Sequence, residues 1–133
     1  MKISGFQNKK KLLKLASNHN WVLYEFDKVL VDDTKNATKI KSSEYQNIGN
    51  YPIIDQGKNY ISGYTNNESG LYKNNPCILF GDHTKVFKYI DFPMYIGADG
   101  VKVLKLNEKI RKDSINIKYL YYFLKTVDLP NEG

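Results

Sequence analysis

A series of short apolar runs, each bounded by turn residues, places the strongest constraint on what this sequence can fold into. The run Pro76–Phe80 is apolar throughout and ends at Gly81-Asp82, which predicts a buried strand. Lys85–Ile90 and Val101–Leu106 instead alternate lysine with apolar residues, the pattern of a strand that has one solvated face. The sequence therefore predicts a sheet of short antiparallel strands, with Lys85 and Lys88 pointing to solvent.

The segment from Gly49 to Gly70 repeats the alternation of strand and turn on a smaller scale. Tyr51–Ile54 and Tyr60–Tyr64 are predicted strands, because they are rich in β-branched and aromatic residues. Gln56–Asn59 is a turn between them, and Thr65–Gly70 is a polar tip.

The region before residue 50 is less regular. Lys9–Ala16 mixes leucine with lysine in a way that predicts a short basic amphipathic helix, which we assign to an N-terminal segment of residues 1–20. From Trp21 to Val31 the pattern fits a strand, or a short helix that follows a strand. Asp32–Asn50 is a long polar stretch, and long loops in compact domains tend to be functional or mobile.

Helical periodicity returns near the C-terminus. Ser114 is a candidate N-cap. The apolar residues that follow it share one helical face: Ile117, Leu120, Tyr121 and Leu124.

The size and composition fit one folded domain, which we assign to residues 21–133. The chain has 133 residues, of which 41% are hydrophobic. No apolar run approaches the roughly 20 residues that cross a bilayer, so no membrane partner is expected. The N-terminus has no secretory h-region, and a single cysteine excludes a disulfide framework, so we expect a cytoplasmic protein.

The charge balance favours a polyanionic partner. Twenty Lys and Arg residues face 14 Asp and Glu residues, which gives a net charge of +6, and the chain has 11 tyrosines. All but one of the cations are lysine and asparagine is frequent, a bias that favours A- and T-rich codons and a bacterial source. Lys, Asn and Tyr together can bind phosphates, reach base edges and stack on bases. An ordinary basic surface is the alternative.

Few residues suggest catalysis. Asp82 and His83, with Asp91 and Asp99, could supply metal ligands, but their spacing matches no metal signature, and a structural turn is the favoured interpretation. Cys77 lies inside a buried strand and is expected to be a small core residue. We therefore expect no catalytic residue, no metal and no cofactor.

Candidate DNA contacts lie mainly in two segments, Thr34–Gln46 and Lys58–Asn67, which are rich in Lys, Asn, Thr and Tyr. Lysine suits phosphates and guanine, and asparagine suits adenine. The complete candidate set is Lys35, Lys39, Lys41, Lys58, Asn59, Tyr60, Tyr64, Asn66, Asn67, His83, Thr84 and Lys85.

The order of motifs from Trp21 onward resembles the target recognition domain of the specificity subunit of type I restriction–modification systems. The motifs that carry the resemblance are Trp21-Val22-Leu23, Tyr51–Gly57, Ile61–Tyr64, Cys77–Thr84, Gly97–Val101 and Lys118–Leu124. The resemblance implies an α+β domain with a strongly bent, partly barrel-like antiparallel sheet and a few short helices. It also implies that the motif residues Gly63, Gly81, Asp82 and Gly100 are scaffold, since turn chemistry explains them.

The resemblance also implies partners. In that family a full subunit carries two recognition domains, each reading one half of a split DNA target, and its spacer helices dock methyltransferase subunits and, through them, the restriction subunit. This chain carries one such domain, and we expect it to lack the full spacer helices. The alternative functions are a protein-interaction or inhibitory module that mimics part of a specificity subunit, and a small metal-dependent nuclease built on Asp82, His83 and Asp91.

Overall fold

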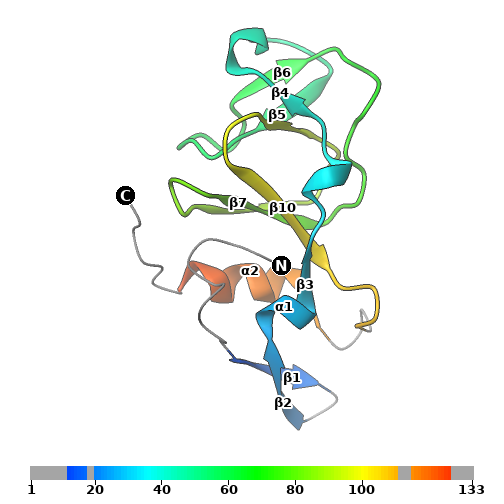
Figure 1. Ribbon diagram of the computed structural model, residues 1–133, viewed down its shortest axis with the longest axis vertical. Helices are drawn as coiled ribbons and strands as arrows, with labels where there is room; N and C mark the ends of the chain where they lie inside the picture. Colours follow the sequence, from blue (N-terminus) through cyan, green and yellow to red (C-terminus); the bar gives the residue numbers. More distant parts are fainter. Residues whose placement is uncertain (1–11, 18–19, 111–114, 127–133) are drawn as a thin grey trace.

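The computed structural model describes residues 12–17, 20–110 and 115–126, which form a small hairpin, two four-stranded sheets and short helices (Figure 1). The helices are α1 (Phe26–Val29) and α2 (Ile117–Lys125), with 3-10 turns η1 (Thr34–Asn36) and η2 (Ser42–Glu44). The hairpin consists of β1 (Leu12–Ser17) and β2 (Asn20–Glu25).

The first four-stranded sheet is antiparallel throughout. Its strands, in spatial order, are β3 (Leu30–Asp32), β10 (Val101–Leu106), β7 (Cys77–Gly81) and β8 (Phe87–Ile90). The second sheet is mixed, because β9 runs parallel to both of its neighbours. Its order is β4 (Lys39–Ile40), β9 (Tyr95–Gly97), β5 (Tyr51–Ile54) and β6 (Gly63–Thr65).

The elements stack in layers. In Figure 1, α2 lies on one side of the β7–β10 sheet, and β4, β5 and β6 lie beyond its other side. The predicted α+β class with a curled, half-barrel sheet is confirmed. The parallel pairs of β9 were not predicted, because strand direction depends on the path of the chain between strands and not on local pattern.

Strand β7 joins the two halves of the core. Its residues are all buried, as the uniformly apolar run predicted. Ile78 and Phe80 belong to the cluster that packs beneath α2, whereas Cys77 and Leu79 belong to the cluster between the sheets. Because alternate side chains of a strand point to opposite faces, this one strand contributes residues to both hydrophobic clusters.

Helix α2 covers the outer face of the first sheet. Ile117, Leu120 and Leu124 are buried on it, so the predicted helical face is confirmed. Asn116 caps the helix by accepting a hydrogen bond from the Lys118 backbone N–H at 2.8 Å. The predicted cap Ser114 lies outside the described residues.

The predicted N-terminal helix is wrong where the structure describes it. Leu12–Ser17 form β1, which pairs antiparallel with β2. A helix at this position would form only local backbone bonds, whereas the strand obtains its partners from residues 20–25, a pairing that sequence periodicity does not reveal. After β2 the chain forms α1 and then β3, so a short helix after a strand is the correct alternative for this region.

Candidate nucleic-acid interface

Gln56, two residues after the end of β5, ties together three of the sequence motifs. Its side-chain Oε1 accepts hydrogen bonds from the backbone N–H groups of His83 (2.9 Å) and Thr84 (3.0 Å). Its Nε2 donates to the carbonyl oxygen of Asp99 at 2.7 Å. One amide side chain therefore holds the 81–85 turn, the 97–100 turn and the end of β5 side by side, an arrangement we call the Gln56 cluster.

Two glycines allow this close approach, each for a different reason. Gly100 has φ +63°, a left-handed conformation that favours glycine. Gly81 does not have a positive φ, so its backbone conformation does not require glycine. A Cβ there would lie 2.5 Å from Cβ of Gln56 and 2.5 Å from Oγ1 of Thr84, so Gly81 is required by packing inside the cluster.

The cluster displays predicted contact residues on its surface. His83 and Thr84 are exposed on the 81–85 turn that Gln56 holds, and the Thr84 hydroxyl also donates to Gln56 Oε1 at 3.3 Å. Lys85 has φ +61°, and its Nζ lies 5.9 Å from the centre of the Phe80 ring. This turn therefore has a fixed backbone and an outward polar edge.

The neighbouring 55–60 turn is fixed from inside by Lys88. We predicted a solvated Lys88, and this is wrong: the side chain is 5% exposed. Its Nζ donates to the carbonyl oxygens of Asp55 (2.6 Å) and Asn59 (2.7 Å), because the turn after β5 folds over the face of β8 that the alternating pattern assigned to water. Burial lowers the pKa of Lys88, although the charge of Asp55 opposes that shift.

Asp55 fixes the same turn through its side chain. Its carboxylate accepts hydrogen bonds from Ser62 Oγ (2.5 Å), the Gly57 backbone N–H (2.8 Å) and Tyr45 Oη (3.1 Å). Burial raises the pKa of Asp55, but these hydrogen bonds outweigh burial and leave the pKa below its ordinary value. Lys58 and Asn59 are exposed on a turn that is anchored at both ends.

Four more predicted contact residues lie between the 55–60 turn and the end of β6, and each is hydrogen-bonded or partly buried within the protein. Tyr60 is 46% exposed, and its hydroxyl donates to the carbonyl oxygen of Tyr89 at 2.6 Å. Tyr64 is partly buried in β6. Asn66 Oδ1 accepts from the Asn50 backbone N–H at 2.9 Å, and Asn67 Oδ1 accepts from the Ser69 backbone N–H at 3.1 Å.

Three predicted lysines lie on other elements than the turns that Gln56 holds. Lys35 in η1, Lys39 in β4 and Lys41 before η2 are all exposed. Strand β4 is one edge of the second sheet, and β6, which carries Tyr64, is the other edge. The structure therefore distributes the predicted residues over several places and does not gather them into one cluster.

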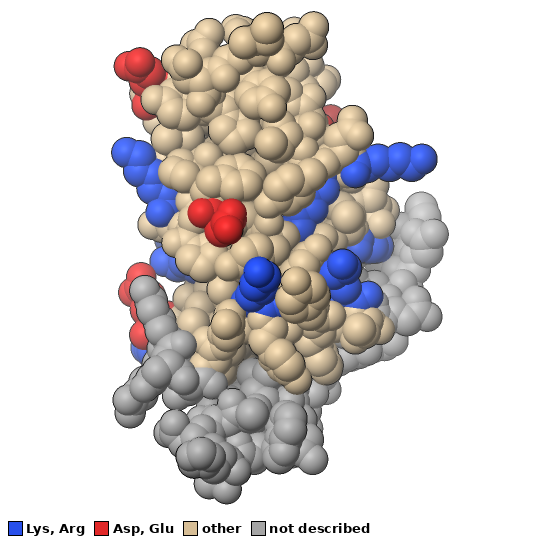
Figure 2. All heavy atoms as spheres, turned by 180° about the vertical axis from the view of Figure 1, so that it is seen from behind, with Lys and Arg blue, Asp and Glu red and all other residues tan. Residues whose placement is uncertain are grey.

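Charge is also unevenly distributed over the surface. Figure 2 shows lysines around the middle and lower part of one face, whereas the upper end shows few charged side chains. This upper end is formed by the region of β4, β5 and β6 in Figure 1. Residues 45–54 and 59–67 contain no charged residue at all. The upper end of the domain therefore carries few charges, whereas the middle of this face shows several lysines.

The catalytic alternatives find no geometric support in the described part of the chain. Within it, no three His, Cys, Asp or Glu side chains form a group that could hold a metal ion, so Asp82, His83 and Asp91 do not assemble one. Cys77 is fully buried, and burial raises the pKa of its thiol to about 12, so it is a core residue as predicted.

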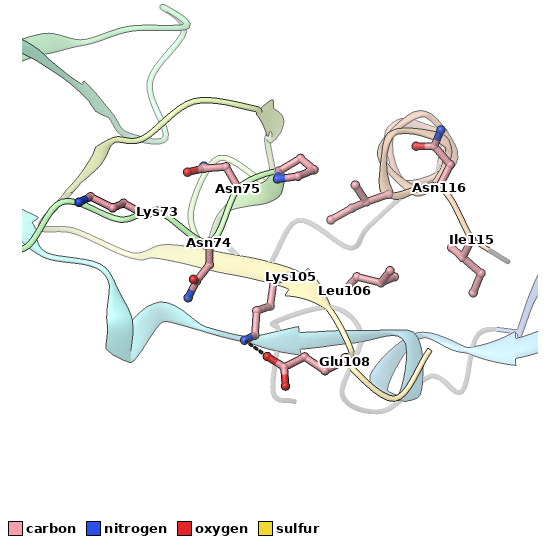
Figure 3. Close-up of a pocket in the computed structure, with 10 residues that line it drawn as sticks. Lys73, Asn74, Asn75, Lys105, Leu106, Glu108, Ile115 and Asn116 are labelled. Atoms are coloured by element: carbon pink, nitrogen blue, oxygen red, sulfur yellow. Dashed lines mark hydrogen bonds and ion pairs between the residues drawn. The ribbon is translucent and has the colours of Figure 1, made fainter. Parts of the chain in front are cut away.

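A cavity of about 470 Å³ lies between the loop before β7, the end of β10 and the entry to α2 (Figure 3). Lys105 on its wall pairs with Glu108, with 3.3 Å between Nζ and Oε1. None of the predicted contact residues lines this cavity. It is therefore separate from the candidate interface.

The Gln56 cluster was missed at the sequence level, although its parts were noted. Gln56-Gly57, Gly81–Thr84 and Gly97–Gly100 each look like an ordinary turn. The sequence offers one weak signal, a glutamine beside a glycine in one turn and a second glycine-bounded turn further along the chain. Only the tertiary structure shows which turn receives which hydrogen bond.

Comparison with known proteins identifies a relative. The chain is 32% identical over 95 residues to the specificity subunit of the type I restriction enzyme EcoR124I/EcoR124II from Escherichia coli, and the match covers 70% of the chain. The chain spans 22% of the length of that protein. No protein-family model and no solved structure matches significantly.

Within the described residues, no helix has the length and apolar character needed to cross a membrane. The resemblance is confirmed: the chain is a relative of part of a type I restriction specificity subunit and corresponds to a target recognition domain.

Proposed function

We propose that this chain is a sequence-specific DNA-binding domain that supplies target choice to a type I restriction–modification complex. The observation that carries the proposal is the 95-residue similarity to a specificity subunit, which extends over 70% of the chain. In this proposal the domain reads one half of a bipartite site in double-stranded DNA. It does no chemistry itself and acts in the cytoplasm with methyltransferase subunits and, through them, with the restriction subunit.

The surface residues divide into two roles in this proposal. Lys35, Lys39 and Lys41 are exposed cations outside the Gln56 cluster, which suits phosphate contacts that orient the domain on the duplex. Lys58 and Asn59 lie on a turn held by Lys88 and Asp55, which suits base contacts because their backbone is already fixed.

The remaining predicted residues complete this interface. His83 and Thr84 extend the base-reading surface from the adjacent turn, with Lys85 beside them. Tyr60 offers a half-exposed ring to stack on a base or sugar. Asn66 and Asn67 hold the loops beside β6 through the bonds described above, and Tyr64 is half-buried in β6.

The test is a transplant of two segments, Thr34–Gln46 and Lys58–Asn67, into a related specificity subunit, followed by mapping of the adenine or cytosine positions that the assembled enzyme methylates. We expect one half of the recognised site to change. A matched control transplants Lys73–Pro76, an equally polar loop from the wall of the cavity, and should leave the site unchanged. An unchanged half-site in a folded, active complex that carries both segments would refute the assignment.

A further inference from the structure

The loop between η2 and β5 carries an exposed aliphatic side chain near its middle. Ile48 is 86% exposed, whereas the other large hydrophobic side chains exposed in the described structure are all tyrosines: Tyr60, Tyr119 and Tyr122. Ile48 lies between Asn47 and the pair Gly49-Asn50. We call residues 46–50 the 46–50 tip.

The backbone of the 46–50 tip is held on both sides. Gln46 and Tyr64 exchange two backbone N–H···O=C bonds of 2.9 Å. The Asn50 backbone N–H donates to Asn66 Oδ1 at 2.9 Å, and Asn66 Nδ2 donates to Gln46 Oε1 at 3.4 Å. A Cβ on Gly49 would lie 2.9 Å from Cβ of Tyr64, so the tip packs directly on β6.

Asn66 is therefore the clamp of this tip. Its side-chain oxygen and nitrogen bond to opposite ends of the loop. Because both polar atoms of the Asn66 side chain already form hydrogen bonds, Asn66 is poorly suited to contact a base. It instead fixes the backbone that determines the direction in which Ile48 points. Loops with a fixed backbone lose less conformational entropy when they bind.

The chemistry at the end of the tip suits base edges better than phosphates. Asn47 and Asn50 are exposed, and neither side-chain amide forms a hydrogen bond with the part of the chain that the structure describes. Residues 45–54 carry no charge, so the tip offers phosphates no cation. In the major groove, an asparagine amide pairs with N6 and N7 of adenine, and an apolar side chain packs against the C5-methyl group of thymine.

We propose that the 46–50 tip is a base-reading element for A·T pairs, in which Ile48 contacts a thymine methyl group and Asn47 or Asn50 contacts an adenine. The proposal rests on the proposed DNA-binding function and adds a site that lies between the two segments named above. Asn66 is its positioning residue.

The test removes the thymine methyl group and the isoleucine separately and together. A target is first selected from a random duplex pool with the whole chain, and each thymine in it is then replaced by deoxyuridine, which lacks only the C5-methyl group. We expect one replacement to weaken binding of the wild-type protein about 4-fold, the worth of one buried methyl-sized group. Ile48→Ala should bind the thymine and deoxyuridine duplexes equally.

The amides are tested by Asn47→Ala and Asn50→Ala. The variant that removes the contact should bind about 5- to 100-fold more weakly and lose its preference for adenine at one position. Asn66→Ala should speed hydrogen exchange at the Asn50 backbone N–H, a change that loss of a base contact alone would not produce. Tyr119→Ala, which truncates an exposed side chain on α2, is the control and should keep wild-type affinity and deoxyuridine sensitivity.

Two results separate the possible failures. If the wild-type protein enriches no sequence, the proposed DNA-binding function is wrong, and the tip proposal is wrong with it. If the protein enriches a target but no deoxyuridine replacement matters, or Ile48→Ala keeps the sensitivity of the wild type, only the tip proposal is overturned. Ile48 is nearly fully exposed, so the variant should fold, and urea unfolding verifies this.

Discussion

Replacing Gln56 tests whether the shared motifs are structural support. Gln56→Ala removes four hydrogen bonds of 2.7–3.3 Å: Gln56 accepts one from the backbone of His83 and two from the backbone and hydroxyl of Thr84, and it donates one to Asp99. A neutral hydrogen bond contributes about 0.5–1.5 kcal/mol to folding, and water can replace part of it at this partly exposed position. We therefore expect the free energy of unfolding to fall by about 1.5–3 kcal/mol.

The assay is equilibrium unfolding in urea, combined with hydrogen exchange at the backbone N–H groups of His83 and Thr84. Both amides should exchange faster in the variant. Gln56→Glu keeps an acceptor for His83 and Thr84 but places a carboxylate oxygen, which cannot donate, against the carbonyl oxygen of Asp99, so it should also lose stability. Gln46→Ala is the matched control, because that exposed glutamine accepts only one long bond from Asn66. The reasoning is refuted if Gln56→Ala is as stable as Gln46→Ala.

Three further predictions follow from the geometry. Gly81→Val should destabilise the fold by about 1–3 kcal/mol, since its Cβ would overlap Gln56 and Thr84; urea unfolding measures this, and a fully stable variant would contradict it. Burial raises the pKa of Asp33, but hydrogen bonds from Tyr72, Asn74 and Asn36 outweigh burial and leave the pKa below its ordinary value of 3.8. The ionised Asp33 therefore stabilises the fold above pH 3.8, and this part of the free energy of unfolding should be lost as the pH falls through the lowered pKa. Asp33→Asn should flatten this pH dependence, and an unchanged pH profile would argue against it. The isolated chain should bind duplex DNA with a log–log salt slope near −3 to −4, as expected for about four phosphate contacts, and a flat salt response would exclude them.

The parts of the fold that were predictable depend on local pattern. The apolar run of β7 predicts burial on both faces, and Ile117, Leu120 and Leu124 predict the buried face of α2, because helix and strand periods are properties of neighbouring residues. Strand β6 shows the limit of such prediction. It begins at Gly63, three residues later than expected, because Tyr60–Ser62 follow the turn that Lys88 holds.

Lys88 and the Gln56 cluster could not be predicted, because both depend on contacts between distant parts of the chain. The lysines of β8 alternate like solvent-facing residues, and only the turn after β5 decides that Lys88 is covered. Gln56 gains its role from turns 27 and 43 residues further along the chain. The chemistry of the candidate contact residues is visible in the sequence, but only the structure shows which side chains already bond within the protein, such as Asn66.

One measurement tests the central claim that surface loops choose the DNA sequence while the Gln56 cluster only supports them. Binding sites are selected from a random duplex pool with the wild-type chain, with Lys58→Ala/Asn59→Ala, and with Gln56→Glu. We predict that the wild-type chain enriches one short motif, that the surface variant loses preference at one or more positions of it, and that Gln56→Glu enriches the same motif in lower yield. An unenriched wild-type pool, or a motif that changes with Gln56→Glu and not with the surface variant, would contradict the account.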